Sequence, residues 1–198
     1  MTRYPDLLAT LDAWFREGLT TAGAGIVPCT TGCTACCHGP FDISPADAAL
    51  VAEGVRLLPP DQRAAMLAAA QDQVGKYAQL APGWERPWDV AALGDGAFDV
   101  LSEALSELPC PALDESGACR IYAHRPATCR LMGLALVTTE GELLENACPI
   151  QVDFPAYEAL PPTPFDLLRF EYEAEEVDEL VVIADGWCVT TIASVALR

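Results

Sequence analysis

The segment VPCTTGCTACCHGP, residues 27–40, is the stretch around which the chain is organised. It carries Cys29, Cys33, Cys36 and Cys37 in quick succession, and His38 follows at once. Thiolates are soft ligands that suit zinc, Cu(I) and iron–sulfur clusters, and short spacings between cysteines let one loop surround a metal centre. This segment therefore predicts a metal site.

A second group of cysteines follows later in the chain. The segment PCPALDESGACRIYAHRPATCR, residues 109–130, contains Cys110, Cys119 and Cys129, and Cys148 follows in NACPI. Together with the first group these make eight thiols, which suffice for two tetrahedral sites or for one cluster with further thiols beside it. Cys188 stands alone in DGWCVTT and is typical of a buried cysteine that packs as a small hydrophobe.

The length and the N-terminus of the chain bear on what the cysteines do. A chain of 198 residues is long enough to bury a hydrophobic core without help from metals or disulfides. The start, MTRYPDLLATLDAWF, lacks the apolar core of a secretion signal, so we expect a cytoplasmic protein. In a reducing cytoplasm, cysteines are metal ligands or redox groups more readily than disulfides.

The charge balance limits the partners of the protein. The chain has 29 acidic and 11 basic residues, a formal net charge of -18, which argues against nucleic acid and against anionic membranes. No apolar run approaches the roughly 20 residues needed to cross a bilayer. We therefore expect a partner, if there is one, to be a protein with a basic surface.

Three of the scarce basic residues lie beside late cysteines. Arg120, Arg125 and Arg130 fall next to or between Cys119 and Cys129. They are candidate cofactor-binding residues, because guanidinium groups can donate hydrogen bonds to sulfur and offset the charge of thiolates. The alternative is that they are ordinary surface or helix-capping residues.

The rest of the chain predicts a mainly α-helical fold. Apolar residues recur at helical spacing over residues 5–20, and Ser44 with Pro45 marks the start of a helix that ends before Pro59. A further alanine-rich helix is expected from Asp61, a shorter one over residues 98–108, and a long acidic one near the C-terminus. The six acidic residues between positions 171 and 179 are expected to form a solvated face.

Loops and turns are predicted between these helices. Residues 82–97 are expected to form a loop held by Trp84 and Trp88, and residues 149–164 an irregular segment rich in proline. The DESG sequence at 114–117 predicts a tight turn that returns Cys119 toward Cys110. Two short strands around Glu140-Gly141 predict a hairpin. We expect one compact domain over residues 1–198, mainly α with a small β-hairpin or sheet.

The residues alone leave the chemistry of the site open. Zinc would close one or two structural sites, whereas an iron–sulfur cluster would need a cysteine at each iron or one open iron. Cys29, Cys33 and Cys36 also have the spacing of radical SAM enzymes. Because neighbouring side chains in an extended segment point to opposite sides, Cys36 and Cys37 are expected to face different ways. His38 and His124 are ligands, proton carriers or packed side chains.

The cysteine motifs resemble those of a known family. CTTGCTACC followed by HGPFDIS, then CPALDESGACRIYAHRPATCR and a further Cys148, are similar to the YkgJ-type cysteine-cluster family, whose members are described as zinc- or iron-chelating. The family loop usually reads C-x2-C-x2-CC, and this chain has one more residue between Cys29 and Cys33. The resemblance implies eight metal-chelating residues: Cys29, Cys33, Cys36, Cys37, Cys110, Cys119, Cys129 and Cys148.

The leading hypothesis is therefore a cysteine-cluster metalloprotein that binds iron as an iron–sulfur cluster, for electron transfer or an oxidoreductase step. An accessory role beside an enzyme is equally compatible with it. The alternative hypothesis is a zinc-binding structural module that mediates contact with another protein. The catalytic residues of any reaction stay unassigned at this point.

Overall fold

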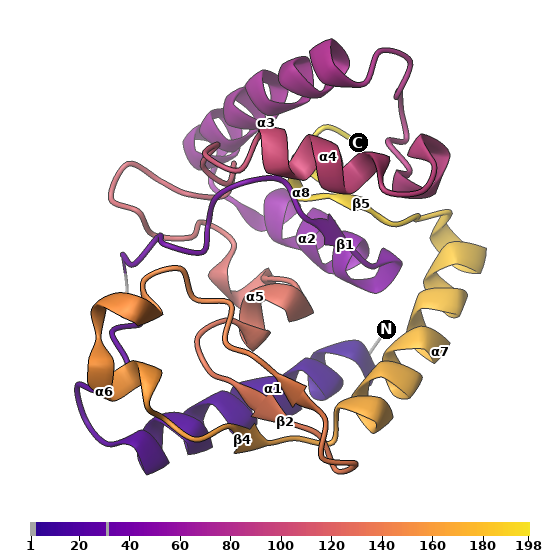
Figure 1. Cartoon of the computed structure of the whole chain (residues 1–198). Helices are drawn as coiled ribbons and strands as arrows, with labels where there is room; N and C mark the ends of the chain where they lie inside the picture. Colours follow the sequence, from indigo (N-terminus) through magenta and orange to yellow (C-terminus); the bar gives the residue numbers. More distant parts are fainter. Residues whose placement is uncertain (1–2, 31) are drawn as a thin grey trace. The chain divides into compact units, whose positions relative to one another are not determined.

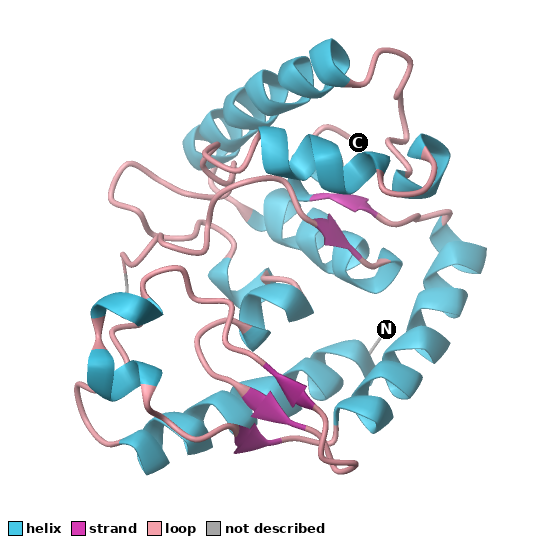
Figure 2. Ribbon diagram, viewed as in Figure 1, coloured by secondary structure: helices cyan, strands magenta, loops and turns pink. Residues whose placement is uncertain are grey.

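The computed structural model describes residues 3–30 and 32–198. Within them the protein is mainly α-helical with two small sheets, as predicted (Figures 1 and 2). The chain contacts define two compact units. Unit 1 comprises Met1–Cys36 and Ala127–Val177, and unit 2 comprises Cys37–Pro126 and Asp178–Arg198. Residues 1–2 and 31 lie outside the described part. That residues 1–198 form one domain stays a prediction.

Unit 1 is built on the first helix, α1 (Arg3–Ala22), which covers the predicted stretch 5–20 and extends it at both ends. Its buried stripe includes Leu8, Leu11 and Trp14 at helical spacing. The Trp14 indole donates a hydrogen bond to the Thr163 carbonyl oxygen (3.2 Å) and its ring lies 5.9 Å from the Phe165 ring. The apolar face of α1 is thereby fixed against the end of unit 1 that carries its sheet.

The sheet of unit 1 has the strand order β3-β2-β4, from β2 (Leu136–Val137), β3 (Leu143–Leu144) and β4 (Thr163–Pro164). Strands β2 and β3 form the predicted hairpin, with Gly141 in its turn at a φ of +86°. The third strand, β4, pairs parallel to β2. Figure 2 shows these strands as a group of magenta arrows next to α1.

The expectation of an irregular segment over residues 149–164 is wrong in part. This segment contains the 3-10 turn η3 (Gln151–Asp153), the short helix α6 (Pro155–Glu158) and strand β4. Pro164 fits an edge strand because the pairing uses its neighbours: Thr163 N–H donates to Ala135 and Phe165 N–H donates to Val137. Proline at the first position of a helix likewise suits α6.

Helix α7 (Leu167–Asp185) confirms the predicted long acidic helix and runs across the boundary between the units. Its acidic residues are only partly a solvated face. Glu173 and Glu176 form ion pairs with Arg3, at 3.6 and 2.7 Å, and the Asp178 carboxylate accepts a hydrogen bond from the Ala46 N–H (2.7 Å). The negative charge of Asp178 near the N-terminus of α2 also interacts favourably with the dipole of that helix.

Unit 2 contains the larger hydrophobic core. Helix α2 (Pro45–Leu57) begins as predicted, with the Ser44 hydroxyl accepting from the Asp47 N–H (3.2 Å), and α3 (Pro60–Leu80) follows. Strands β1 (Asp42–Ile43) and β5 (Thr190–Thr191) pair antiparallel. The C-terminal helix α8 (Ile192–Ala196) is entirely buried in the core of unit 2.

The segment between the two cysteine groups contains one confirmed and one corrected element. Trp84 and Trp88 are both buried and hold the loop as predicted, although the loop includes the 3-10 turn η1 (Val90–Leu93). Helix α4 (Ala97–Ala104) ends four residues before the predicted boundary. After Leu105 the chain turns in short i+3 hydrogen bonds, and the Leu108 carbonyl accepts from the Gly39 N–H instead of continuing a helix.

None of the helices in the described ranges is both long enough and apolar enough to cross a bilayer.

Removing the N-cap of α2 is expected to destabilise the protein. Ser44→Ala leaves the Asp47 N–H without its side-chain acceptor, so we expect a loss of about 1 kcal/mol in the free energy of unfolding, measured by urea denaturation. Ser106→Ala, at an exposed serine of the same unit, serves as control and should change it by less than about 0.5 kcal/mol. Equal effects would show that the cap contributes nothing.

Candidate metal centre

The eight candidate cysteines divide between the two units. Unit 1 carries five of them and unit 2 carries three, and the boundary falls between the adjacent residues Cys36 and Cys37. Cys148 is buried and the other seven are half-buried. The set in unit 1 is Cys29, Cys33, Cys36, Cys129 and Cys148, and the set in unit 2 is Cys37, Cys110 and Cys119.

In unit 1, Cys29 lies against a glycine that leaves little room for a side chain. A Cβ placed on Gly133 would stand 3.2 Å from Cys29 Sγ and 3.1 Å from Phe15 Cε2, and Gly133 has a φ of +107°. The backbone conformation favours glycine, and a side chain there would displace Cys29 and Phe15 by a few tenths of an ångström. Gly133 therefore brings the end of the α5 (Ala127–Leu131) segment next to Cys29.

Cys148 is held by an asparagine and a buried tyrosine. The Asn146 Oδ1 accepts from the Cys148 N–H (3.0 Å), while Asn146 Nδ2 donates to the Tyr157 hydroxyl (2.8 Å). Tyr157 in turn donates to the Gly133 carbonyl oxygen (2.6 Å). Burial raises the pKa of Tyr157, and the nearby Cys148 and Cys29 act in the same direction, whereas the hydrogen bond from Asn146 lowers it.

In unit 2, the first cysteine loop pairs with the segment around Cys110. The Cys110 N–H donates to the Cys37 carbonyl oxygen (2.8 Å), and His38 and Pro109 form an isolated antiparallel bridge. Because Pro109 and Pro111 have no N–H, Cys110 supplies the backbone donor of this short run. Two cysteines far apart in sequence are thus joined through their main chains.

The predicted turn at 114–117 is confirmed and leads back to Cys119. Asp114 Oδ1 accepts from the N–H groups of Ser116 (2.8 Å) and Ala118 (2.9 Å), and hydrogen bonding to Ser116 and Ala118 lowers the pKa of this carboxyl group. Leu113 then forms a bridge with Cys119. Cys110 and Cys119 both pack against the hydrophobic core of unit 2.

The Cys119 sulfur has positive groups and a donor around it. Burial raises the pKa of the Cys119 thiol, and this effect is opposed by a hydrogen bond from the Ile121 N–H and by the charges of Arg125 and Arg120. Arg120 also donates to the Leu113 carbonyl, and the Arg125 guanidinium stacks over the Tyr122 ring at 4.4 Å. Two of the three arginines singled out by the sequence therefore act on a cysteine.

The third arginine, Arg130, pairs with an aspartate, and His124 packs against a glycine. Arg130 is buried in unit 1 and forms an ion pair with Asp12. His124 lies on the 3-10 turn η2 (Tyr122–His124) and packs against Gly54. A Cβ placed on Gly54 would stand 2.7 Å from the Cβ of His124. Cys188 is half-buried, which corrects the expectation of a fully buried residue. Burial raises the pKa of its thiol.

The described residues do not form a closed metal site. Within residues 3–30 and 32–198, no three Cys, His, Asp or Glu side chains stand close enough together to hold one metal ion. What the structure does bring together are pairs: Cys29 and Cys148 both act on Tyr157, and Cys37 is bonded to Cys110 through the backbone. The chemistry of the donor set, thiols with N–H and O–H donors beside them, fits a thiophilic metal.

Comparison with known proteins gives one result. Residues 28–149 match the CxxCxxCC family, which is described as a "Putative zinc- or iron-chelating domain". The chain belongs to this family. No curated protein and no solved structure matches the chain.

The family match separates eight of the nine cysteines from the ninth. It covers more than half of the chain and contains all eight candidate ligands, whereas Cys188 lies outside it. The family description supports metal chelation by this segment and names both zinc and iron. The suspected resemblance is therefore confirmed, and the ligand role of each cysteine stays a prediction.

Sequence reasoning missed Tyr157, Asn146 and Gly133. Tyr157 lies beyond the family match and no motif marks it. The signal for Asn146 was present, because an asparagine side chain often accepts from the N–H of the second residue after it, in an Asx-turn. Here that second residue is Cys148. Gly133 follows Leu131-Met132 without any turn signature.

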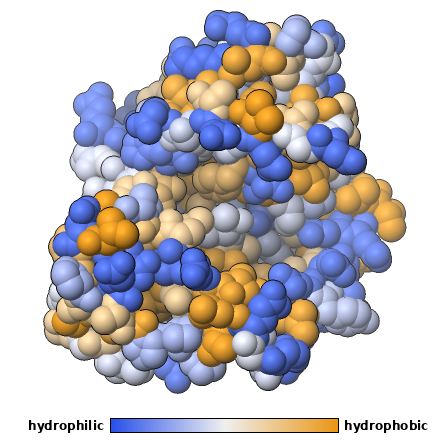
Figure 3. All heavy atoms as spheres, viewed as in Figure 1, coloured by the Kyte–Doolittle hydropathy of each residue, from blue (hydrophilic) through white to orange (hydrophobic). Residues whose placement is uncertain are grey.

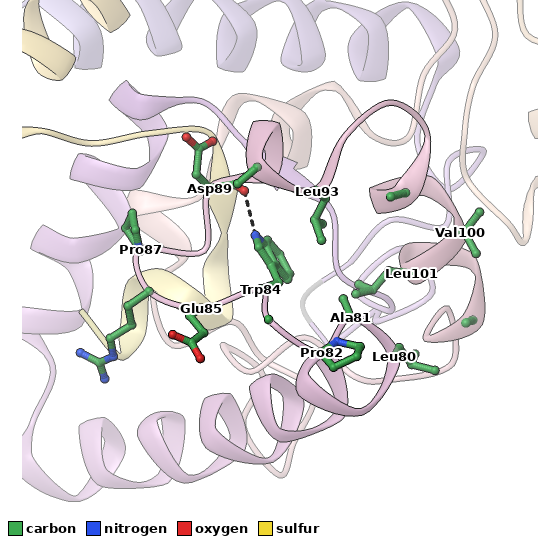
Figure 4. A pocket seen from close by; sticks show the side chains of 15 residues that line it. Leu80, Ala81, Pro82, Trp84, Glu85, Pro87, Asp89, Leu93, Val100 and Leu101 are labelled. Carbon is green, nitrogen blue, oxygen red and sulfur yellow. Dashed lines mark hydrogen bonds between the residues drawn. The ribbon is translucent and has the colours of Figure 1, made fainter.

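A separate cavity lies in unit 2, between the end of α3, the loop with Trp84, and α4 (Figure 4). It measures about 830 Å³ and is lined largely by apolar side chains. Figure 4 shows Trp84 near Leu93 and Leu101, with its indole N–H donating to the Asp89 carbonyl oxygen (2.7 Å). Val100, 70% exposed, and Leu80, 52% exposed, are its most exposed large apolar residues.

Filling the space at Gly133 is expected to disturb Cys29 specifically. Gly133→Ala and the control Gly141→Ala both place alanine at a positive φ, which costs about 1 kcal/mol or more in unfolding free energy. Only Gly133→Ala also meets Cys29 and Phe15, because nothing lies within 4 Å of a Cβ at Gly141. We expect a larger loss for Gly133→Ala in urea unfolding, and equal losses would contradict the close approach.

Proposed function

We propose that the protein is a cytoplasmic metalloprotein whose cysteines bind iron as an iron–sulfur cluster for electron transfer or an oxidoreductase step. The observation that carries this proposal is the all-cysteine donor set of a zinc- or iron-chelating family segment. Unit 1 alone supplies five thiols, and iron–sulfur clusters are held by four. The whole chain, residues 1–198, is proposed to serve this one function.

Groups that donate hydrogen bonds to sulfur support a redox role. The Ile121 N–H and the charges of Arg125 and Arg120 favour a negative Cys119 sulfur. Such donors and charges are the means by which proteins adjust the reduction potential of a cluster. They stand out in a chain with 11 basic and 29 acidic residues.

When bound, a cluster supplies reversible one-electron chemistry. It would accept an electron from a reduced protein partner and give it to an oxidised one, with no bond made or broken in the polypeptide. The residues of the chain hold the sulfurs, keep water from Cys148 through burial, and offset the charge of the thiolates. An accessory role for the same cluster beside an enzyme differs only in its partner.

Metal and acid-labile sulfide content test the proposal. Protein purified without oxygen is expected to contain iron and sulfide in about equal amounts and to show a brown colour that reduction bleaches. Colourless protein with stoichiometric zinc would replace the proposal by the zinc alternative. Protein without bound metal, even after reconstitution with iron and sulfide, would contradict both.

Single cysteine substitutions test whether eight of the nine cysteines bind metal and Cys188 does not. Cys119→Ser and Cys129→Ser are expected to lower the iron content by half or more, because serine is a poor ligand for a soft metal. Cys188→Ser, the matched control outside the family match, should keep the wild-type content. Equal loss in all three, measured on reduced protein of the same preparation, would contradict the assignment.

The zinc alternative has its own support. Unit 2 carries three candidate thiols together with His38 and His124, and three cysteines with one histidine are a common ligand set for structural zinc. The cavity in unit 2 supports the associated role in binding a protein. Figure 3 shows apolar atoms over α4 with hydrophilic groups next to them.

The partner that fits this cavity is a basic protein segment with an apolar anchor. Between residues 85 and 107 the chain has six acidic residues and Arg86 as its one basic residue. Four of these acids are exposed on α4 or within three residues of its ends, namely Asp95, Asp99, Glu103 and Glu107. An amphipathic helix with lysines beside its leucines would pair apolar with apolar surface and positive with negative charge.

A synthetic helical peptide of leucine and lysine tests this surface on the full chain. Val100→Ser is expected to weaken its binding about tenfold, because one buried valine contact is lost, and binding should weaken as salt rises. Ile183→Ser, at an 82% exposed residue of α7, is the matched control and should bind as wild type. Equal weakening in both variants, or binding that is independent of salt, would contradict the assignment.

A further inference from the structure

Three segments of unit 1 meet at the hydroxyl of one buried tyrosine. Tyr157 lies on α6 and is 1% exposed. It contacts the Gly133 segment, which approaches Cys29, and the Asn146 segment, which leads into Cys148. The two cysteines therefore depend on the same polar atom.

The hydrogen bonds of this hydroxyl can be counted. A phenolic oxygen has one proton to donate and two lone pairs to accept with. The proton goes to the Gly133 carbonyl oxygen and one lone pair takes the Asn146 Nδ2–H. The single proton is thus used, and the two bonds join the Gly133 segment and the Asn146 segment to α6.

Asn146 completes the arrangement by using both ends of its amide. Its Nδ2 donates to Tyr157 at 2.8 Å and its Oδ1 accepts from the Cys148 N–H at 3.0 Å. The backbone of Cys148 is therefore fixed by the same group that orients the tyrosine. Phenylalanine would fill the ring's space equally well, so packing alone does not account for a buried hydroxyl here.

We propose that Tyr157 and Asn146 are positioning residues of the metal site, which hold the Gly133 segment beside Cys29 and fix the backbone of Cys148. This inference rests on the proposed function, since it assumes that the cysteines bind metal. The Tyr157 hydroxyl acts through the backbone, because its proton is donated to the Gly133 carbonyl oxygen. Asn146 acts on Cys148 through the N–H of that residue.

The positions of the two sulfur atoms have a measurable signature. They set the geometry of the metal–thiolate bonds, so a change in them alters the energy of charge transfer from thiolate to metal as well as the affinity. A residue that only stabilises the fold would change the melting temperature and leave the spectrum of each bound metal unchanged. Cobalt(II) is a suitable probe, because tetrahedral thiolate sites that bind zinc also bind cobalt and give coloured complexes.

The experiment titrates cobalt(II) into the reduced, metal-free full chain and its variants. Tyr157→Phe removes the hydroxyl and keeps the ring, and Asn146→Ala removes both amide contacts. Each is expected to weaken cobalt binding about tenfold or more and to shift the charge-transfer band. Asn146→Ser, whose hydroxyl can still accept from the Cys148 N–H, should recover part of the affinity. Tyr172→Phe, at an exposed tyrosine, is the control.

The outcomes separate this inference from the function beneath it. Wild-type affinity and spectrum in both Tyr157→Phe and Asn146→Ala would overturn the inference while metal binding stands, and so would a lower melting temperature with an unchanged spectrum. Should Tyr157→Phe fail to fold, Asn146→Ala, in a half-buried loop, decides alone. Wild-type protein that takes up neither cobalt nor iron would overturn the proposed function and this inference together.

Discussion

The adjacency of Cys36 and Cys37 constrains the whole arrangement, because the chain passes from one unit to the other between them. Cys36 lies in a turn rather than in extended backbone, so the alternation of side chains expected from the sequence does not apply there, and the two residues belong to different units. Each unit then fixes its own cysteines separately. In unit 2 the Cys37 carbonyl is bonded to the Cys110 N–H, and in unit 1 the Cys29 sulfur rests against Gly133.

Charge is the second constraint. Thiolates in a chain with a net charge of -18 add negative charge where it is already in excess, and burial raises the pKa of Cys119 further toward the neutral thiol. A bound cation reverses this balance because it stabilises the thiolates directly. Arg120 and Arg125 act in the same direction, which gives these two basic residues a reason to lie beside a cysteine.

How far the sequence alone predicts this structure depends on whether the signals are local. The start of α2 at Ser44, the Asp114 turn and the β2–β3 hairpin follow from short motifs, and all three are confirmed. Helix α8 and strand β4 are too short for a periodic pattern and form through contacts with distant segments. The role of Tyr157 was not predicted for the same reason, since its partners lie 11 and 24 positions earlier.

The hydrogen-bond donors at the cysteines bear on the choice between zinc and iron. A structural zinc site needs little beyond four ligands of the right geometry, because zinc has no redox chemistry. Donors aimed at sulfur matter more where a reduction potential has to be set. Cys119 has such surroundings, since the Ile121 N–H and the charges of Arg120 and Arg125 favour its negative form. The reduction potential of a bound metal is therefore the property that these groups would change.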